Sequence, residues 1–149
     1  MPVDRDLTPE DLALIEAARD AIRARYRENR HHIGCALRTR SGRVHTAVHL
    51  DTYVGRASVC AEAIAVGRAM SDGDGDIVSI VSVRHPRPRE ASQEIPVVSP
   101  CGICREMLAD FARDSIVIVP VDDGRAVGKV AIRELLPNKY ERIVDRPRI

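Results

Sequence analysis

Aromatic residues are scarce in this sequence: phenylalanine, tryptophan and tyrosine together make up 3%, and tryptophan is absent. Stacking on aromatic side chains is a main source of affinity for single-stranded nucleic acids, and a net charge of +1 provides no broad basic surface for DNA or RNA. Apolar runs are also short, since none approaches the roughly eighteen consecutive residues of a transmembrane helix. These absences argue against nucleic acids and membranes as partners.

The sequence also lacks a recognisable targeting signal and has few cysteines. Its first residues, MPVDRD, do not contain the apolar core of a secretion signal, so we expect a cytoplasmic protein with reduced thiols. The length of 149 residues and the hydrophobic content of 44% are typical of one globular domain, which we expect to cover residues 1–149. Two of the four cysteines stand three residues apart, which indicates a metal site more often than a disulfide in a protein that is not secreted.

What is present is a pair of short motifs that contain three of the four cysteines. Cys60 precedes Glu62 by two residues, and Cys101 and Cys104 follow Pro100 in the pattern P-C-x-x-C. Three cysteine ligands leave one place free at a tetrahedral zinc ion, and a catalytic zinc ion holds its water in that place. The same pair of motifs is the signature of the zinc-dependent nucleobase deaminases. The sequence therefore predicts a catalytic Zn²⁺ site with Cys60, Cys101 and Cys104 as ligands.

Glu62 and Arg105 are the residues expected to assist this zinc site. Zinc lowers the pKa of a bound water toward ~7, and Glu62 is then placed to accept the proton and to deliver it to the substrate. We expect Cys60 and Cys101 to begin helices, because the partial positive charge at a helix N-terminus favours a thiolate. Arg105 follows the last ligand in sequence and is expected to support the thiolates by donating hydrogen bonds to the sulfurs.

The residues alone leave two other interpretations open. A structural zinc site would have a fourth protein ligand, which one of the five histidines could supply, and the protein would then be a non-catalytic zinc-stabilised module. A polynucleotide-editing deaminase would carry the same motifs, although it requires basic and aromatic surface that this composition lacks. Ammonia release from a panel of small amines would separate these alternatives. The fourth cysteine, Cys35, is expected to be a buried and inert thiol.

Hydrophobic periodicity predicts strands that alternate with helices. Thr8 and Pro9 have the pattern of a helix start, and the nearly continuous apolar segment 59–70 predicts a helix that is buried on most sides. This alternation implies an α/β fold with a mixed or parallel sheet and helices on its faces. The expected helices cover residues 8–26, 59–70 and 102–113, and a short helix is expected to close at residues 135–137. The expected strands cover residues 33–39, 43–50, 77–83, 116–121 and 127–132.

The motifs resemble those of the cytidine deaminase superfamily, and the resemblance covers nearly the whole chain. Residues 34–37 and 41–43 are similar to the first hairpin of small cytidine deaminases, residues 99–105 to their second motif, and residues 127–140 to the blasticidin-S deaminase branch. The resemblance implies a three-layer α/β/α cytidine deaminase-like fold with a five-stranded mixed sheet, usually as a homotetramer. It also implies a zinc-dependent hydrolase that removes the exocyclic amine of a cytosine-like ring in a nucleoside, a modified nucleoside or a free base.

The resemblance also assigns substrate-binding positions. His31 stands where the pyrimidine nucleoside enzymes have a ring-stacking phenylalanine. His49 and Asp51 stand eleven and nine residues before the first cysteine ligand, where those enzymes have an asparagine and a glutamate that bind the sugar. Ala61 and Ser99, beside the two cysteine motifs, complete the implied substrate site. We therefore expect a small aminated heterocycle as the ligand, in a pocket that neighbouring subunits help to close.

Overall fold

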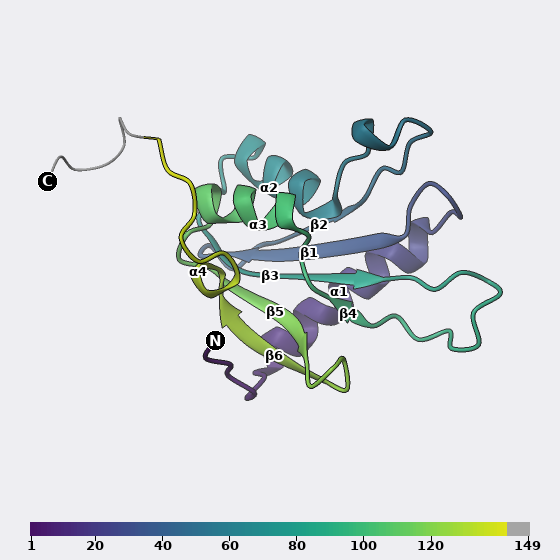
Figure 1. Ribbon diagram of the computed structural model, residues 1–149, viewed down its shortest axis with the longest axis horizontal. Helices are drawn as coiled ribbons and strands as arrows, with labels where there is room; N and C mark the ends of the chain where they lie inside the picture. Colours follow the sequence, from purple (N-terminus) through teal and green to yellow (C-terminus); the bar gives the residue numbers. More distant parts are fainter. Residues whose placement is uncertain (143–149) are drawn as a thin grey trace, which may run out of the picture.

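The computed structural model describes residues 1–142, which form a mixed β-sheet with helices on both of its faces (Figure 1). The helices are α1 (Pro9–Arg25), α2 (Ala61–Ser71), α3 (Gly102–Phe111) and α4 (Ile132–Leu135), and a 3-10 turn, η1, covers Gly55–Ala57. The strands are β1 (Ile33–Thr39), β2 (Val44–Val48), β3 (Ile77–Arg84), β4 (Val97–Val98), β5 (Ile116–Val121) and β6 (Ala126–Ala131). Within the described residues, no helix combines the length and the apolar character that crossing a bilayer requires.

The sheet contains one strand more than expected. Five strands follow one another in the order β2-β1-β3-β5-β6, and β4 pairs with β3 outside this path. β3 and β5 are parallel and the other neighbours are antiparallel, so the predicted α/β fold with a mixed sheet is confirmed. The expected number of five strands is wrong because the two residues of β4 pair with Ser82 and Val83. A strand of two residues is too short for an alternating pattern to reveal.

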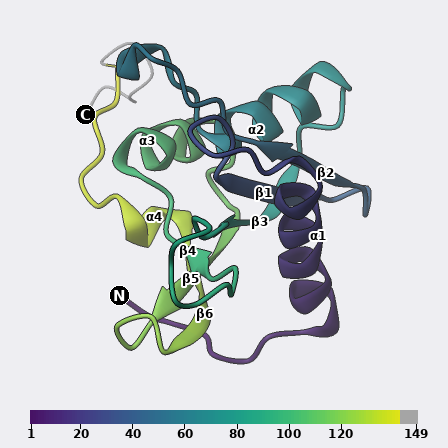
Figure 2. The same ribbon diagram turned by 90° about the vertical axis from the view of Figure 1, so that its right-hand side faces the viewer.

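The three layers follow from the alternation of side chains along the strands. Cys35 and Leu37 of β1 belong to the apolar cluster that includes residues of α2 and α3, whereas Ala36 between them belongs to the cluster that includes α1. Figure 2 shows α1 on one side of the sheet and α2 and α3 on the other. The three-layer α/β/α arrangement implied by the resemblance is therefore present.

Helix α1 is fixed to the sheet at its start and in its middle. Thr8 caps the helix in a capping box with Asp11, and the buried carboxylate of Asp11 lies 3.2 Å from Nζ of Lys129 on β6. In the middle, Gly34 of β1 allows a close approach, because a Cβ atom there would lie 2.5 Å from the carbonyl oxygen of Ala18. Helix α1 thus covers one face of the sheet and leaves the other face to the helices that carry the cysteines.

Helix α2 is buried along most of its surface, as expected from its apolar sequence, and one strip faces solvent. Ala61, Ala65 and Ala69 are buried in the apolar cluster on this face of the sheet, whereas Gly67 and Arg68 are exposed to solvent. Small side chains at a spacing of four residues share one face of a helix and allow the helix to lie close to its neighbours. The many alanines therefore reflect close packing on one face.

Candidate active site

One edge of the sheet collects the segments that carry the predicted site residues. Strand β1 begins at this edge, and β2 and β3 end there, because the register places Gly34 beside both Val48 and Val83. Strand β4 pairs with the same end of β3 and leads into α3. Backbone hydrogen bonds between Leu50 and Val59 bring the segment that follows β2 against the segment that precedes α2. The starts of α2 and α3 therefore meet at this edge.

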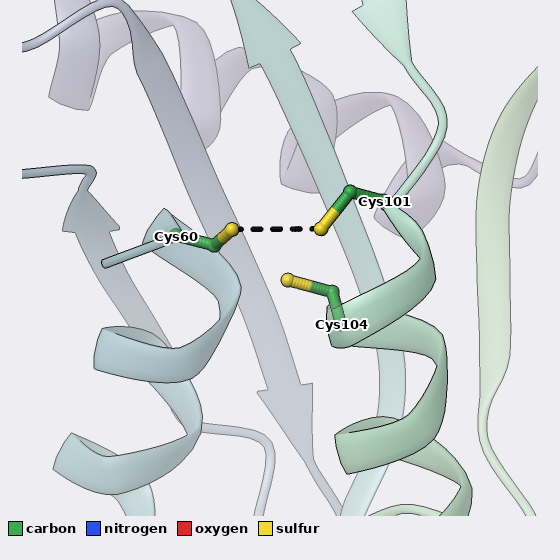
Figure 3. Close-up of side chains that lie close together, drawn as sticks. All are labelled: Cys60, Cys101 and Cys104. Atoms are coloured by element: carbon green, nitrogen blue, oxygen red, sulfur yellow. Dashed lines mark hydrogen bonds between the residues drawn. The ribbon is translucent and has the colours of Figure 1, made fainter. Parts of the chain in front are cut away.

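The thiols of Cys60, Cys101 and Cys104 form a compact group between these two helix starts (Figure 3). Cys60 is the N-cap residue of α2, Cys101 is the N-cap residue of α3, and Cys104 lies about one turn further along α3. The Sγ atoms of Cys60 and Cys101 are 3.6 Å apart, and the three Sγ atoms all lie within 4.8 Å of one another. Sulfur ligands at ~2.3 Å from a tetrahedral zinc ion are ~3.8 Å apart, so the thiol group fits zinc.

The thiol group has three members and no fourth protein ligand. Among residues 1–142, no histidine, aspartate or glutamate brings a ligand atom within the same 4.8 Å of all three sulfurs. A structural zinc site would have protein side chains in all four positions. Cys104 is buried, Cys60 is half-buried and Cys101 is exposed, so the group is reached by solvent from the Cys101 side. The arrangement therefore has the open position that a catalytic zinc site requires.

The three thiols differ in how easily they ionise. Burial raises the pKa of Cys60 and of Cys104, and the negative charge of Glu62 adds to this effect at both. Burial acts in the same direction at Cys101, but hydrogen bonds from the backbone N–H groups of Cys104 and Ile103 and from the neighbouring thiols outweigh it and lower the pKa of Cys101. The start of α3 thus favours a thiolate at Cys101. The other two thiols need a nearby cation, which a coordinated metal provides.

Glu62 is a buried carboxylate without a protein partner. It is the second residue of α2 and is 5% exposed, and among residues 1–142 no hydrogen bond or ion pair reaches its carboxylate. Its negative charge adds to burial in raising the pKa of Cys104 and also that of Cys35, which is fully buried in β1 as predicted. Glu62 therefore lies near both the thiol group and the sheet below it. The carboxylate oxygens still reach solvent, because they are not among the buried side-chain atoms that lack a partner. A carboxylate beside the thiol group that is open to solvent and makes no contact in the fold points to a role in chemistry.

Arg105 does not make the predicted contact with the sulfurs. Its Nε atom donates to the carbonyl oxygen of Pro100 at 2.9 Å, and its Nη1 atom donates to the carbonyl oxygen of Leu135 at 3.3 Å. The physical reason is that a helical side chain leans toward the N-terminus of its helix, which carries the guanidinium past the thiols to the preceding loop. Arg105 therefore braces the loop before Cys101 against α4, and its support of the thiolates is indirect.

His31, His49 and Asp51 lie together at the same edge of the sheet. The Nδ1 atom of His31 donates to the carbonyl oxygen of His49 at 2.8 Å. The backbone N–H of Asp51 donates to the carbonyl oxygen of Arg30 at 2.8 Å, while the Asp51 carboxylate has no hydrogen-bond partner in the described part of the chain. His49 and Asp51 stand on either side of Leu50. The backbone of Leu50 is hydrogen-bonded to that of Val59, the residue before Cys60. Their role in binding a substrate stays a prediction.

Ala61 and Ser99 lie close in sequence to the two N-cap cysteines. Ala61 is fully buried as the first residue of α2, directly after Cys60. Ser99 is exposed in the short connection between β4 and Cys101. These two predicted residues therefore adjoin the two cysteine motifs, and their contact with a substrate stays a prediction.

A cluster of rings behind His49 is a feature that sequence reasoning missed. Tyr26 stacks on His85 with ring centroids 3.8 Å apart and meets His32 edge-on at 5.4 Å, and the centroid of His32 lies 5.8 Å from that of His49. These rings come from the end of α1, the start of β1 and the segment after β3, so only the sheet register brings them together. The available signal was the pair of adjacent histidines before β1, because neighbours in extended backbone face opposite sides.

The sequence matches a protein family and several known proteins over most of its length. Residues 8–120 match the family described as "Cytidine and deoxycytidylate deaminase zinc-binding region". A blasticidin-S deaminase of Bacillus cereus is 47% identical over 137 residues, which cover 92% of this chain and 96% of that protein. A probable cytidine deaminase of Dictyostelium discoideum is 29% identical over 110 residues, which cover 74% of this chain and 69% of that protein.

Solved structures share the fold. The cytidine deaminase of Burkholderia pseudomallei superposes with a TM-score of 0.70 at 24% identity, covering 90% of this chain and 100% of that chain. The cytidine deaminase of Bacillus anthracis gives a TM-score of 0.70 at 23% identity, covering 87% of this chain and 88% of that one. At these identities the likeness concerns the fold alone, whereas the family match and the Bacillus cereus relative extend over most of the sequence. The chain therefore belongs to the cytidine and deoxycytidylate deaminase family that is defined by this zinc-binding region.

Proposed function

We propose that this protein is a zinc-dependent hydrolase that replaces the exocyclic amine of a cytosine-type ring with a carbonyl group and releases ammonia. The observation that carries the proposal is a group of three thiols without a fourth protein ligand, next to the buried and unpartnered Glu62. A zinc site that only stabilises the fold needs neither the open position nor the carboxylate.

Glu62 is the proposed proton carrier of the reaction. Zinc on Cys60, Cys101 and Cys104 supplies, when bound, a water whose pKa is lowered toward ~7. Glu62 accepts a proton from the attacking water and delivers it to the ring nitrogen beside the carbon that bears the amine. The attack leaves a hydroxyl group on that carbon. Glu62 then takes the proton of this hydroxyl group and passes it to the amine, the carbon–nitrogen bond breaks, and ammonia leaves while the carbonyl group forms. Both transfers need free carboxylate oxygens, which Glu62 has because it lacks a partner among residues 1–142.

The two helix starts hold the proposed ligands in place. Cys60 and Cys101 are N-cap residues, so the partial positive charges of α2 and α3 offset the negative charge that three thiolates accumulate. Arg105 fixes the loop before Cys101 through two backbone carbonyl groups. These interactions set the ligand geometry before substrate arrives, which is the kind of preorganisation that catalysis by a metal site depends on.

A modified cytosine nucleoside is the proposed substrate, with blasticidin S as the first candidate. The relative named for blasticidin S is 47% identical over nearly the whole of both chains, whereas the relative named for cytidine is 29% identical over a shorter stretch. His31, His49 and Asp51 are proposed to bind the part of the substrate outside the ring. Ala61 and Ser99, on the two sides of the thiol group, are proposed to contact the ring itself.

Ammonia release from a panel of compounds tests the reaction and the substrate class together. The panel contains blasticidin S, cytidine, deoxycytidine, deoxycytidylate, cytosine and a cytosine-containing single-stranded oligonucleotide. We expect the highest kcat/KM for blasticidin S and no release from the oligonucleotide. Highest activity on the oligonucleotide would instead support a polynucleotide-editing enzyme. No release from any compound, in a preparation with about one zinc per chain, would support a non-catalytic zinc-stabilised module.

We also propose that the chain acts as one domain and assembles into a homotetramer whose neighbouring subunits cover the site. Ile103, between two of the cysteines, is 79% exposed, and Tyr53 and Val54 in the loop before α2 are 93% and 69% exposed. Large apolar side chains exposed around a reactive group favour coverage by another chain. Light scattering at assay concentrations should give the mass of four chains, and a fully active monomer would refute the assembly.

A further inference from the structure

The end of α4 and the residues that follow it, 135–141, form a strap that contacts α3 directly after the last of the three thiols. Figure 2 shows this C-terminal strap, in yellow, beside α3. Arg105, which follows that thiol in sequence, donates from Nη1 to the carbonyl oxygen of Leu135 at 3.3 Å. The carboxylate of the next residue, Glu106, lies 3.4 Å from Nζ of Lys139. Two consecutive residues of α3 are therefore bonded to the strap.

Lys139 reaches α3 because the strap turns sharply after α4. Asn138 has a φ of 53°, which lies in the left-handed region that asparagine adopts more readily than most residues. After this turn, Nζ of Lys139 lies 2.8 Å from the carboxylate of Asp110 as well as near Glu106. Asp110 and Glu106 are four residues apart and share one face of α3, so the ammonium group joins two successive turns of the helix. Both carboxylates raise the pKa of Lys139, Asp110 most strongly.

The strap is attached to α3 by separate polar contacts and not by continuous packing. A groove of about 970 Å³ lies between the two, and Ala109, Phe111 and Tyr140 are among the residues that line it. The start of the strap is fixed differently, because Ile132 of α4 is fully buried in the apolar cluster that also contains Leu108 of α3. The core therefore holds the end of the strap that begins at α4.

Arg105 joins this fixed end to the loop before the second cysteine motif. Its Nε atom donates to the carbonyl oxygen of Pro100 at 2.9 Å, while its Nη1 atom is bonded to Leu135. A guanidinium group is planar and rigid, so the two nitrogens keep a constant separation and hold the two carbonyl groups at a constant separation as well. Pro100 directly precedes Cys101, and Cys104 directly precedes Arg105. Both α3 thiols thus lie next to a residue that this contact fixes.

We propose that Arg105 and Lys139 are positioning residues for zinc, and that through them the C-terminal strap holds Cys101 and Cys104 at ligand spacing. They act through the helix and the loop that carry the thiols, not by touching the metal. The proposal rests on the zinc-binding part of the proposed function and does not depend on which ring is deaminated. Residues that orient metal ligands from outside typically contribute ~10–100-fold to metal affinity.

Arg105 should contribute more than Lys139. Its acceptors are two backbone carbonyl groups and its side chain is half-buried, so both bonds are partly shielded from water. The partners of Lys139 are more exposed, since the side chain of Glu106 is 49% exposed and that of Asp110 is 62% exposed. Ion pairs at such exposure are weak and are screened by salt. The contribution of Lys139 should therefore fall as the ionic strength rises.

The zinc affinity of variants tests the proposal without any substrate. The Kd for zinc is measured by competition with a chromogenic chelator, well below the Tm of each variant. We expect Kd to rise ~10–100-fold in Arg105→Met and about two- to fivefold in Lys139→Met at low ionic strength. Arg105→Lys keeps the charge but loses the rigid fork, so its Kd should lie between those of the wild type and Arg105→Met.

A Kd of Arg105→Met within twofold of the wild-type value would overturn the proposal. If Arg105→Met does not fold, Lys139→Met decides, and a Kd unchanged from the wild type at low ionic strength would overturn it.

Arg113→Met is the matched control for a purely structural role. Arg113 lies beyond the end of α3 and is paired with Glu141 of the strap at 3.3 Å, so its loss removes a similar contact at a point further from the thiols. We expect its Kd for zinc to equal that of the wild type. The absorption bands of the cobalt(II)-substituted protein, which report the geometry of the ligands, should change in Arg105→Met and not in Arg113→Met. An equal rise in Kd in both variants would show general loosening and would overturn the proposal.

These measurements separate the proposal from the deaminase reaction. If zinc-loaded wild-type protein deaminates nothing on the panel, the proposed function fails, and the Kd series still decides the role of the strap. If the wild type is active and Arg105→Met binds zinc as tightly, the proposed function stands and the positioning role fails.

Discussion

Replacing Glu62 with glutamine separates a catalytic role from a structural one. Glutamine keeps the shape of the side chain and one acceptor, but it cannot carry a proton at neutral pH. One positioned general acid–base group contributes ~10²–10⁴-fold to the rate, which corresponds to ~2.7–5.4 kcal/mol of transition-state stabilisation. Because Glu62 is proposed to serve two transfers in each cycle, we expect kcat to fall by about 10⁴-fold or more.

The same substitution should leave the fold intact. A carboxylate in the first turn of a helix contributes ~0.3–1 kcal/mol through the helix dipole. Glu62 makes no hydrogen bond or ion pair among residues 1–142, so the glutamine variant loses no other contact. We therefore expect the Tm of Glu62→Gln to lie within a few degrees of that of the wild type, with about one zinc per chain retained.

Glu10→Gln is a matched control for this prediction. Glu10 is the second residue of α1, as Glu62 is of α2, but it is exposed and lies far from the thiol group in sequence. Its replacement should lower Tm slightly and leave deamination unchanged. Tm, zinc content and ammonia release are measured on the same preparations. Activity of Glu62→Gln within tenfold of the wild type, at normal zinc content, would refute the proposed role.

The remaining predictions concern the metal, the packing of α1 and the response to pH. Metal analysis of Cys101→Ser should show almost no bound zinc, whereas Cys35→Ser should keep about one zinc per chain; undiminished zinc in Cys101→Ser would contradict its role as a ligand. In denaturant titrations, Gly34→Ala should lower the free energy of unfolding by ~1–3 kcal/mol, because a Cβ atom there meets a carbonyl oxygen of α1 at 2.5 Å. Gly67→Ala, at an open position of α2, should raise the free energy of unfolding by ~0.4–1 kcal/mol. Stability should also fall as the pH drops below 6.5, because burial lowers the pKa of His32 in the folded state and the unfolded chain therefore binds the proton first. The slope of unfolding free energy against pH should be shallower in His32→Asn, and an unchanged slope would contradict this cause.

The thiol group could be predicted because local rules position each of its members. Cys60 and Cys101 are each the N-cap residue of a helix, and Cys104 lies one turn along the second helix. Local sequence therefore places all three thiols at helix starts, whatever the pairing of the strands. Periodicity likewise recovered β1 and β5 with the bounds that the structure shows. Both are apolar along most of their length because they lie inside the sheet with helices on both faces.

The features that could not be predicted depend on which strands pair and in which register. Strand β4 is visible only through its pairing with β3, which is why six strands replace the expected five. Arg105 donates to carbonyl groups five residues before it and thirty residues after it, and nothing in the sequence marks either group as an acceptor. The rings of Tyr26, His32 and His85 meet because α1 and β3 end, and β1 begins, at one edge of the sheet. In each case the contact joins residues from separate segments, and the local sequence of neither segment indicates which partner it will meet.

The zinc group and the proposed substrate side depend on different parts of the fold. The thiols depend on two helix starts, whereas His49 depends on hydrogen bonds to residues 31–33 across the β1–β2 pairing. The backbone bonds between Leu50 and Val59, at 2.9 and 3.0 Å, link these two parts. If His49 and Asp51 bind substrate as proposed, substitutions of these two side chains should change KM while the thiols and Glu62 keep their places. Substitution of Cys60, Cys101 or Cys104 should accordingly lower the zinc content, whereas substitution of His49 or Asp51 should change KM and leave the zinc content unchanged.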